Sequence, residues 1–118
     1  MAIKFHYDSE DDILTIYDSE NSPKETIEFS EFLNIDINKD KGIVGIEIFD
    51  ALKYFGSLQD KINKEFLESI QDIKINCRNE RNTWFMVVEL ITKEETIKSP
   101  LPPFRKTEYT SPLIASCN

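Results

Sequence analysis

The sequence is poor in the residues from which most active sites are built. Its 118 residues include one histidine, three glycines and two cysteines. One histidine, His6, cannot form a multi-histidine metal site, and three glycines are too few for a phosphate-binding loop. Cys77 and Cys117 lie far apart in the chain, which predicts two reduced thiols. These shortages favour a protein without catalytic activity and without a cofactor.

Long apolar runs are missing as well. The apolar stretches are short and interrupted by charged residues, and none approaches the ~20 residues that a membrane span requires. The N-terminal residues enter a strand-like alternation at once, which predicts no signal peptide. We therefore expect a cytoplasmic protein that does not enter a membrane.

Basic residues are scarce in the first half of the chain. Residues 1–56 hold 13 acidic and 5 basic side chains, whereas residues 57–118 hold 9 of each. The whole net charge of −8 therefore belongs to the first half. Nucleic-acid binding draws on lysine and arginine, so this charge argues against direct contact with DNA or RNA. It favours solubility, or a basic protein partner.

Alternating apolar residues predict a set of antiparallel hairpins. The run 83–92 is apolar on both faces, which is typical of a central strand, and 26–29 is short enough to be an edge strand. Gly42 stands in the turn between two strands that we place at the sheet centre. The predicted strands lie at residues 3–7, 13–17, 26–29, 32–37, 43–49, 73–77 and 83–92.

Helical spacing occurs once over a long stretch. Apolar residues recur from Leu58 to Ile70, and Ser57 can cap the start, which predicts one main α-helix over about 57–71. Four prolines after position 99 predict an extended tail. We thus expect the α+β class, an antiparallel sheet of hairpins with this helix, as a single domain over 1–98. We expect the tail, residues 99–118, to pack on the domain or on a partner. The sequence leaves open whether the protein forms a homodimer.

Two groups of acidic and amide side chains are candidate sites. Paired carboxylates can hold Mg²⁺ or share a proton, and Asp8, Glu10, Asp11 and Asp12 form one such binding candidate. The alternative is a solvated turn, which the lack of nearby partners other than His6 favours.

The second group has the ligand spacing of a calcium-binding EF-hand loop. Asp36, Asn38, Asp40 and Glu47 occupy relative positions 1, 3, 5 and 12 and are candidate metal ligands. However, Gly42 stands one position late, and strand patterns rather than helices flank the loop. A β-hairpin is therefore the favoured interpretation.

Three segments of the first half carry a family resemblance. They are Tyr7-Asp8, the run Asp12–Ile16, and the block Asp40–Ala51. Over about residues 3–55 the chain resembles the small prokaryotic domain-of-unknown-function family 2283. The resemblance implies a compact β-rich module with no established activity or catalytic residues. Because some members are encoded beside small toxin-like proteins, it also implies an antitoxin-like role.

Together these features predict a small acidic, non-catalytic protein-interaction module. Its expected partner is a protein, of basic character, with no nucleic acid and no membrane. The alternative is a weak divalent-metal-binding protein or a small enzyme that uses one of the acidic clusters.

Overall fold

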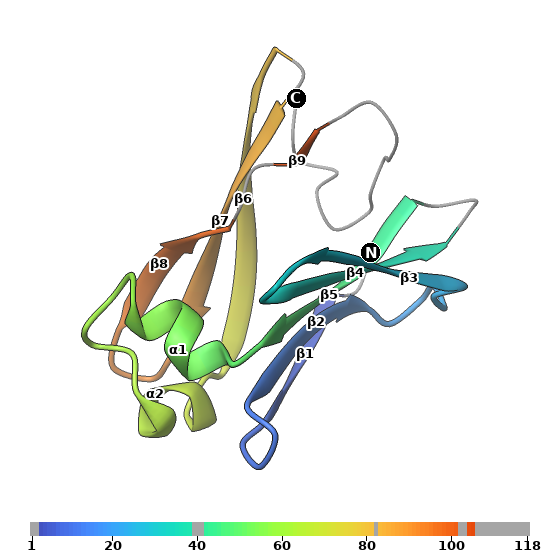
Figure 1. Ribbon diagram of the computed structural model, residues 1–118. Coiled ribbons are helices and arrows are strands. Elements are labelled where there is room, and N and C mark those ends of the chain that lie inside the picture. Colours follow the sequence, from blue (N-terminus) through green and yellow to red (C-terminus); the bar gives the residue numbers. More distant parts are fainter. Residues whose placement is uncertain (1–2, 39–41, 82, 102–103, 106–118) are drawn as a thin grey trace.

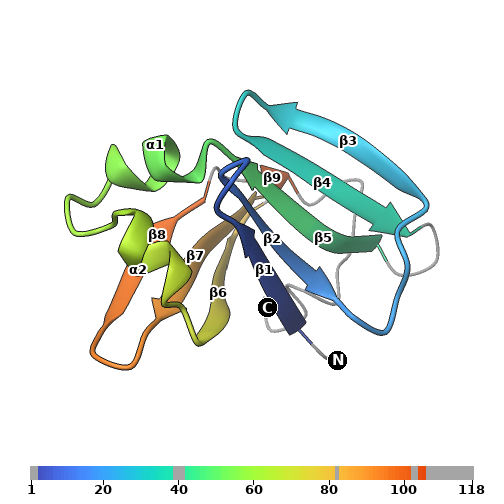
Figure 2. The same cartoon turned by 90° about the horizontal axis from the view of Figure 1, so that it is seen from below.

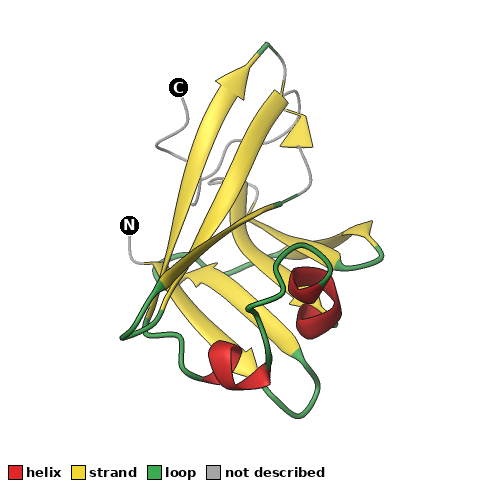
Figure 3. Ribbon diagram, turned by 90° about the vertical axis from the view of Figure 1, so that its left-hand side faces the viewer, coloured by secondary structure: helices red, strands yellow, loops and turns green. Residues whose placement is uncertain are grey.

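The computed structural model describes residues 3–38, 42–81, 83–101 and 104–105, which form two antiparallel β-sheets and two short helices (Figure 1). The predicted α+β class with antiparallel pairing is confirmed. The strands are divided between two sheets, however, and a single sheet was expected. Figure 3 shows the second sheet rising steeply from the first, with the helices on one side.

The first sheet contains five strands in the order β1-β2-β5-β4-β3. Its central strand is β5, and β3 lies at an edge, as predicted. The pairing of Leu14 with Ile48 and of Leu33 with Ile48 brings apolar residues of three strands onto one face. The strands are β1 (Ile3–Asp8), β2 (Ile13–Asp18), β3 (Glu25–Ser30), β4 (Leu33–Asn38) and β5 (Gly42–Phe49).

The second sheet is built around β7 (Thr83–Ile91), the strand predicted to be central. It pairs with β6 (Asp72–Glu80) on one side and with β8 (Thr96–Pro100) on the other. A two-residue strand, β9 (Phe104–Arg105), also pairs with β7. Because its two faces alternate, β7 directs Met86, Val88 and Leu90 into the core.

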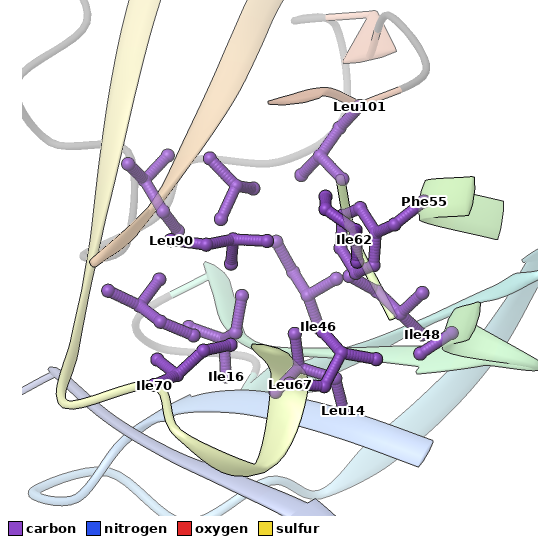
Figure 4. Close-up of a cluster of buried hydrophobic side chains, with 14 of the residues drawn as sticks. Leu14, Ile16, Ile46, Ile48, Phe55, Ile62, Leu67, Ile70, Leu90 and Leu101 are labelled. Atoms are coloured by element: carbon purple, nitrogen blue, oxygen red, sulfur yellow. The ribbon is translucent and has the colours of Figure 1, made fainter. Parts of the chain in front are cut away.

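The core lies between the two sheets and extends to the helices. Figure 4 shows side chains from both sheets and from the helical segment meeting in one cluster. The most deeply buried of them include Leu14, Ile16, Ile46, Ile48, Phe55 and Leu90. Each sheet thus shields the apolar face of the other from water, which is the main force that holds such layered folds together.

The helix predicted over 57–71 is wrong in its extent. The structure has α1 (Ala51–Gly56) and α2 (Lys64–Glu68) in its place. Ser57 ends α1, and Asn63 begins α2 by accepting a hydrogen bond from the Phe66 N–H at 2.8 Å.

Side-chain burial explains why the helical spacing misled the prediction. Ile62, Phe66, Leu67 and Ile70 are buried as expected, but Leu58 is 46% exposed. The apolar spacing is therefore satisfied by a turn followed by a short helix. Asn63, whose side chain competes with a continuing helix by capping a new one, marks the break.

The C-terminal tail is described only in part. Ser99 and Pro100 complete β8, Leu101 is buried in the core, and β9 follows. Residues 106–118, including Cys117, lie outside the described residues, so the predicted packing of the whole tail stays a prediction. Neither helix in the described ranges has the length or apolar character of a membrane span.

Candidate functional site

The first acidic cluster occupies the turn between β1 and β2. The Asp8 carboxylate accepts hydrogen bonds from the backbone N–H groups of Glu10 at 3.0 Å and Asp11 at 3.1 Å. This is the local pairing by which aspartate stabilises a turn. Asp8 therefore has a structural task, and Glu10 and Asp11 project outward into solvent.

Asp12 joins this turn to the start of α1. Its carboxylate accepts a hydrogen bond from the Tyr7 hydroxyl at 2.7 Å and another from the Leu52 N–H at 3.1–3.2 Å. Its backbone carbonyl accepts the Ala51 N–H at 3.1 Å. Asp50 precedes the helix in a left-handed conformation and makes no side-chain cap. Asp12 thus caps a helix that begins about forty residues later.

The polar contacts of Asp12 also affect Tyr7. Burial, the hydrogen bond to Asp12 and the negative charges of Asp12, Glu68 and Asp8 raise the pKa of the Tyr7 phenol far above its usual value. Tyr7 therefore stays protonated and donates its hydrogen bond throughout the physiological range. These three carboxylates come from two different parts of the chain, the β1–β2 turn region and α2.

The second cluster is divided by the geometry of the β4–β5 hairpin. Asn38 ends β4, where its side-chain amide donates to the Ser22 carbonyl at 2.8 Å, while Asp36 lies beside Glu47. Asp40 lies outside the described residues, so the four-ligand set stays a prediction. In the described ranges, no three His, Cys, Asp or Glu side chains are grouped closely enough to hold a metal ion.

Asp36 and Glu47 form a carboxyl pair on the outer face of the first sheet. Thr26 donates its hydroxyl to Asp36 at 2.6 Å. Burial, the negative charge of Asp36 and a hydrogen bond to Asp36 raise the pKa of the Glu47 carboxyl. The pair needs room on the sheet, and Gly45 supplies it, because a Cβ there would lie 2.8 Å from an Asp36 carboxylate oxygen.

This pair belongs to a larger outward-facing surface, which we call the acidic sheet face. The strand register places Glu28, Asn34, Glu47, Thr15 and His6 in one row across the sheet, and Thr26, Asp36, Gly45, Tyr17 and Lys4 in the next. Figure 2 looks onto this sheet from below, and no helix crosses it in that view. The sequence-based predictions missed Glu28 and Tyr17, although Tyr17 alternates with the buried Ile16 and Glu28 follows the partly buried Ile27.

A groove lies at the edge of the same sheet, between β1 and α2, and was also missed. It offers about 300 Å³ and opens to solvent. No sequence signal predicted it, because α2 lies some sixty residues from β1. Its lining includes His6, Tyr7 and Ser9 from the β1 side and Leu67, Glu68 and Ile70 from the α2 side.

Fold and surface together define a small two-sheet α+β domain with an acidic sheet face. Residues 4–51 match the family described as protein of unknown function, DUF2283, which confirms the resemblance seen in the sequence. The match ends at Ala51, the first residue of α1, and so includes Asp12 but stops one residue before Leu52, whose N–H bonds to the Asp12 carboxylate. Neither the curated proteins nor the solved structures gave a match.

Proposed function

We propose that this protein is a non-catalytic interaction module that binds a basic protein partner through the acidic sheet face. The observation that supports it most is the carboxyl pair of Asp36 and Glu47. The pair is partly desolvated, and no lysine or arginine of the described ranges forms an ion pair with it. Two adjacent carboxyls oppose each other's ionisation, so a cationic side chain from a partner is favoured there.

The two sheets differ in the charge of their outer faces. Lys74, Glu89 and Lys98 form one row across the second sheet, where opposite charges alternate. The acidic sheet face has Asp36 and Glu47 on its inner strands β4 and β5, and Glu28 on the edge strand β3. A basic protein is therefore steered toward the first sheet.

Tyr17 gives this face an apolar contact point. It lies on the outer side of β2, opposite Gly45, and is 37% exposed. Tyrosine is enriched at the centres of protein interfaces because it combines a large apolar ring with a hydroxyl. Tyr17 and the neighbouring carboxyl pair together suit a partner that presents lysine or arginine beside apolar side chains.

An antitoxin-like role is one form of this proposal, because neutralising a partner requires binding and no catalysis. In this form of the proposal, the protein acts in the prokaryotic cytoplasm, where such a partner is made. A homodimer is compatible with this proposal if its interface lies elsewhere and leaves the acidic sheet face accessible.

The test is capture of partners from a prokaryotic lysate at about 50 mM and about 500 mM salt, since ionic pairing is screened at the higher concentration. The test variant combines Glu28→Lys with Glu47→Gln. The control variant makes the same charge change in the loop after β7, with Glu94→Lys and Glu95→Gln. We expect a basic protein that is retained at low salt by the wild type and the control and lost from the test variant.

Two results contradict the proposal. One is that no basic protein is retained at low salt. The other is that the test and control variants retain it equally, which would place the contact elsewhere.

The alternative, a weak divalent-cation site, also has one specific observation in its favour. Asp36 and Glu47 present adjacent carboxyl oxygens, the ligands that Ca²⁺ and Mg²⁺ prefer. A site saturated at 100 times its Kd would add about 2.7 kcal/mol to the free energy of unfolding. Thermal melts with and without about 5 mM of either ion decide this, with Glu47→Gln as the control. An unchanged Tm removes the alternative.

A further inference from the structure

Among the described residues, no strand pairs with the edge of β1 that faces away from β2. In the described part of the chain, β1 pairs with β2 alone, from Ile3 opposite Asp18 to Asp8 opposite Ile13. The first strand of the other sheet, β6, approaches β1 but does not pair with it. An edge of this kind presents unpaired backbone N–H and C=O groups to any extended chain that reaches it.

The groove runs along the C-terminal half of this edge. Figures 1 and 2 both show α2 beside β1. Leu67 and Ile70 are buried on the helix side of the groove, whose exposed lining is mostly polar, and Glu68 is exposed at the rim. The groove therefore combines an unpaired strand edge, a mostly polar lining and an exposed carboxylate.

The electrostatic environment of the groove is negative. Tyr7 lines it and lies within the influence of Asp8, Asp12 and Glu68, whose charges all oppose ionisation of the phenol. No lysine or arginine of the described ranges is ion-paired with these three carboxylates. A cationic side chain is thus the complementary occupant.

We infer that the groove holds an extended segment of the protein partner, which adds to the edge of β1 as a further strand and places a lysine or arginine side chain beside Glu68. Backbone pairing supplies much of the affinity in this mode of recognition, and side chains in flanking pockets supply the specificity. The inference rests on the proposed function, because it states how the partner is held. His6 connects the two surfaces, since it lies on the acidic sheet face and also lines the groove.

The experiment is an NMR titration of the ¹⁵N-labelled full chain with a synthetic heptapeptide of alternating lysine and valine. We expect chemical-shift changes concentrated in residues 5–9 and 67–70, and slower amide exchange in β1. A second peptide, N-methylated at every other residue, cannot complete the backbone pairing and should bind at least tenfold more weakly. Equal binding of the two peptides would overturn the strand addition.

Two helix variants test the cation site. Glu68→Lys reverses the charge at the rim, and Glu65→Lys reverses an exposed charge on the same helix outside the groove. We expect Glu68→Lys to raise the Kd of the peptide about two- to fivefold and Glu65→Lys to leave it nearly unchanged. Equal effects of the two variants would overturn the placement of the cation.

The outcomes separate this inference from the proposed function. Shifts confined to residues 15, 17, 28 and 47 would refute the groove and leave binding through the acidic sheet face in place. Groove binding of the peptide together with no basic protein retained from lysate would refute the proposed function instead. Concentration-dependent shifts in residues 5–9 without peptide would identify a second copy of the chain as the occupant and overturn the inference.

Discussion

The contact of Asp12 with Tyr7 and α1 leads to the sharpest stability prediction. Replacing Asp12→Gly removes the carboxylate but keeps a residue suited to the left-handed backbone at this position, where φ is 57°. The change therefore measures the side chain without adding backbone strain. Asp12→Ala, which is less suited to this φ, should be more destabilising than Asp12→Gly.

The expected size follows from the two hydrogen bonds that disappear. Loss of a helix cap costs about 0.5–2 kcal/mol, and a hydrogen bond to a charged group contributes about 1.5–3 kcal/mol. Because the Tyr7–Asp12 contact is only part-buried, its contribution should fall at the low end of its range. We expect Asp12→Gly to lower the free energy of unfolding by about 2–4 kcal/mol.

Urea denaturation followed by far-UV circular dichroism measures this loss. With a slope of about 1–3 kcal/mol per molar urea for a protein of this size, the midpoint should fall by about 0.7 M or more. Tyr7→Phe provides the matched control, since it removes only the hydroxyl. Its cost should be about 1 kcal/mol or more in the wild type and close to zero when combined with Asp12→Gly.

Two outcomes would refute the reasoning. A loss below about 0.5 kcal/mol for Asp12→Gly would show that the cap contributes little, as is usual for surface substitutions. An undiminished cost of Tyr7→Phe in the Asp12→Gly background would show that the two groups do not interact.

Three further predictions concern the sheets. The pKa of Glu47 is raised in the folded protein, so the stability that its protonated carboxyl contributes is present at low pH and is lost as the pH rises through the folded pKa. Glu47→Gln should therefore raise the free energy of unfolding at pH 7 but not below about pH 4. Thermal melts over a range of pH check this. Ser99 is fully buried and its hydroxyl has no hydrogen-bond partner among the described residues. Ser99→Ala should therefore leave the free energy of unfolding unchanged or raise it by up to about 2 kcal/mol, with a raised Tm. A clear loss of stability would show that the hydroxyl has a partner. Gly45→Ala should lower the free energy of unfolding by about 1 kcal/mol or more, because the added methyl group meets Asp36. In the Asp36→Ala background the same change should become stabilising. A loss of stability that is unchanged in that background contradicts the contact.

Sequence patterns located most of the strands because burial and alternation are coupled directly. All seven predicted strand segments coincide with β1 to β7, and the central positions of β5 and β7 followed from their apolar character. The helical segment was less well predicted. Apolar spacing does not distinguish a continuous helix from a turn followed by a short one, and the cap at Asn63 decided between them.

The candidate sites show a similar division. The acidic residues Asp8 to Asp12 could be identified as a turn, yet the hydrogen bond of Asp12 to the Leu52 N–H depends on the fold alone. The proximity of Asp36 and Glu47 followed from a hairpin register that the sequence only suggested. Glu68 beside Tyr7 has no counterpart in any local pattern.

The sequence by itself therefore determined local patterns and summed properties. These are the strand alternation, the hairpin turns, and the negative charge concentrated in residues 1–56. Tertiary structure alone decided how the strands divide into two sheets, which aspartate caps α1, and where α2 forms a groove with β1. The physical reason is that alternation and net charge are properties of neighbouring residues or of their sum. Capping across forty residues and a groove across sixty depend instead on how the two sheets pack, and no short stretch of sequence encodes that.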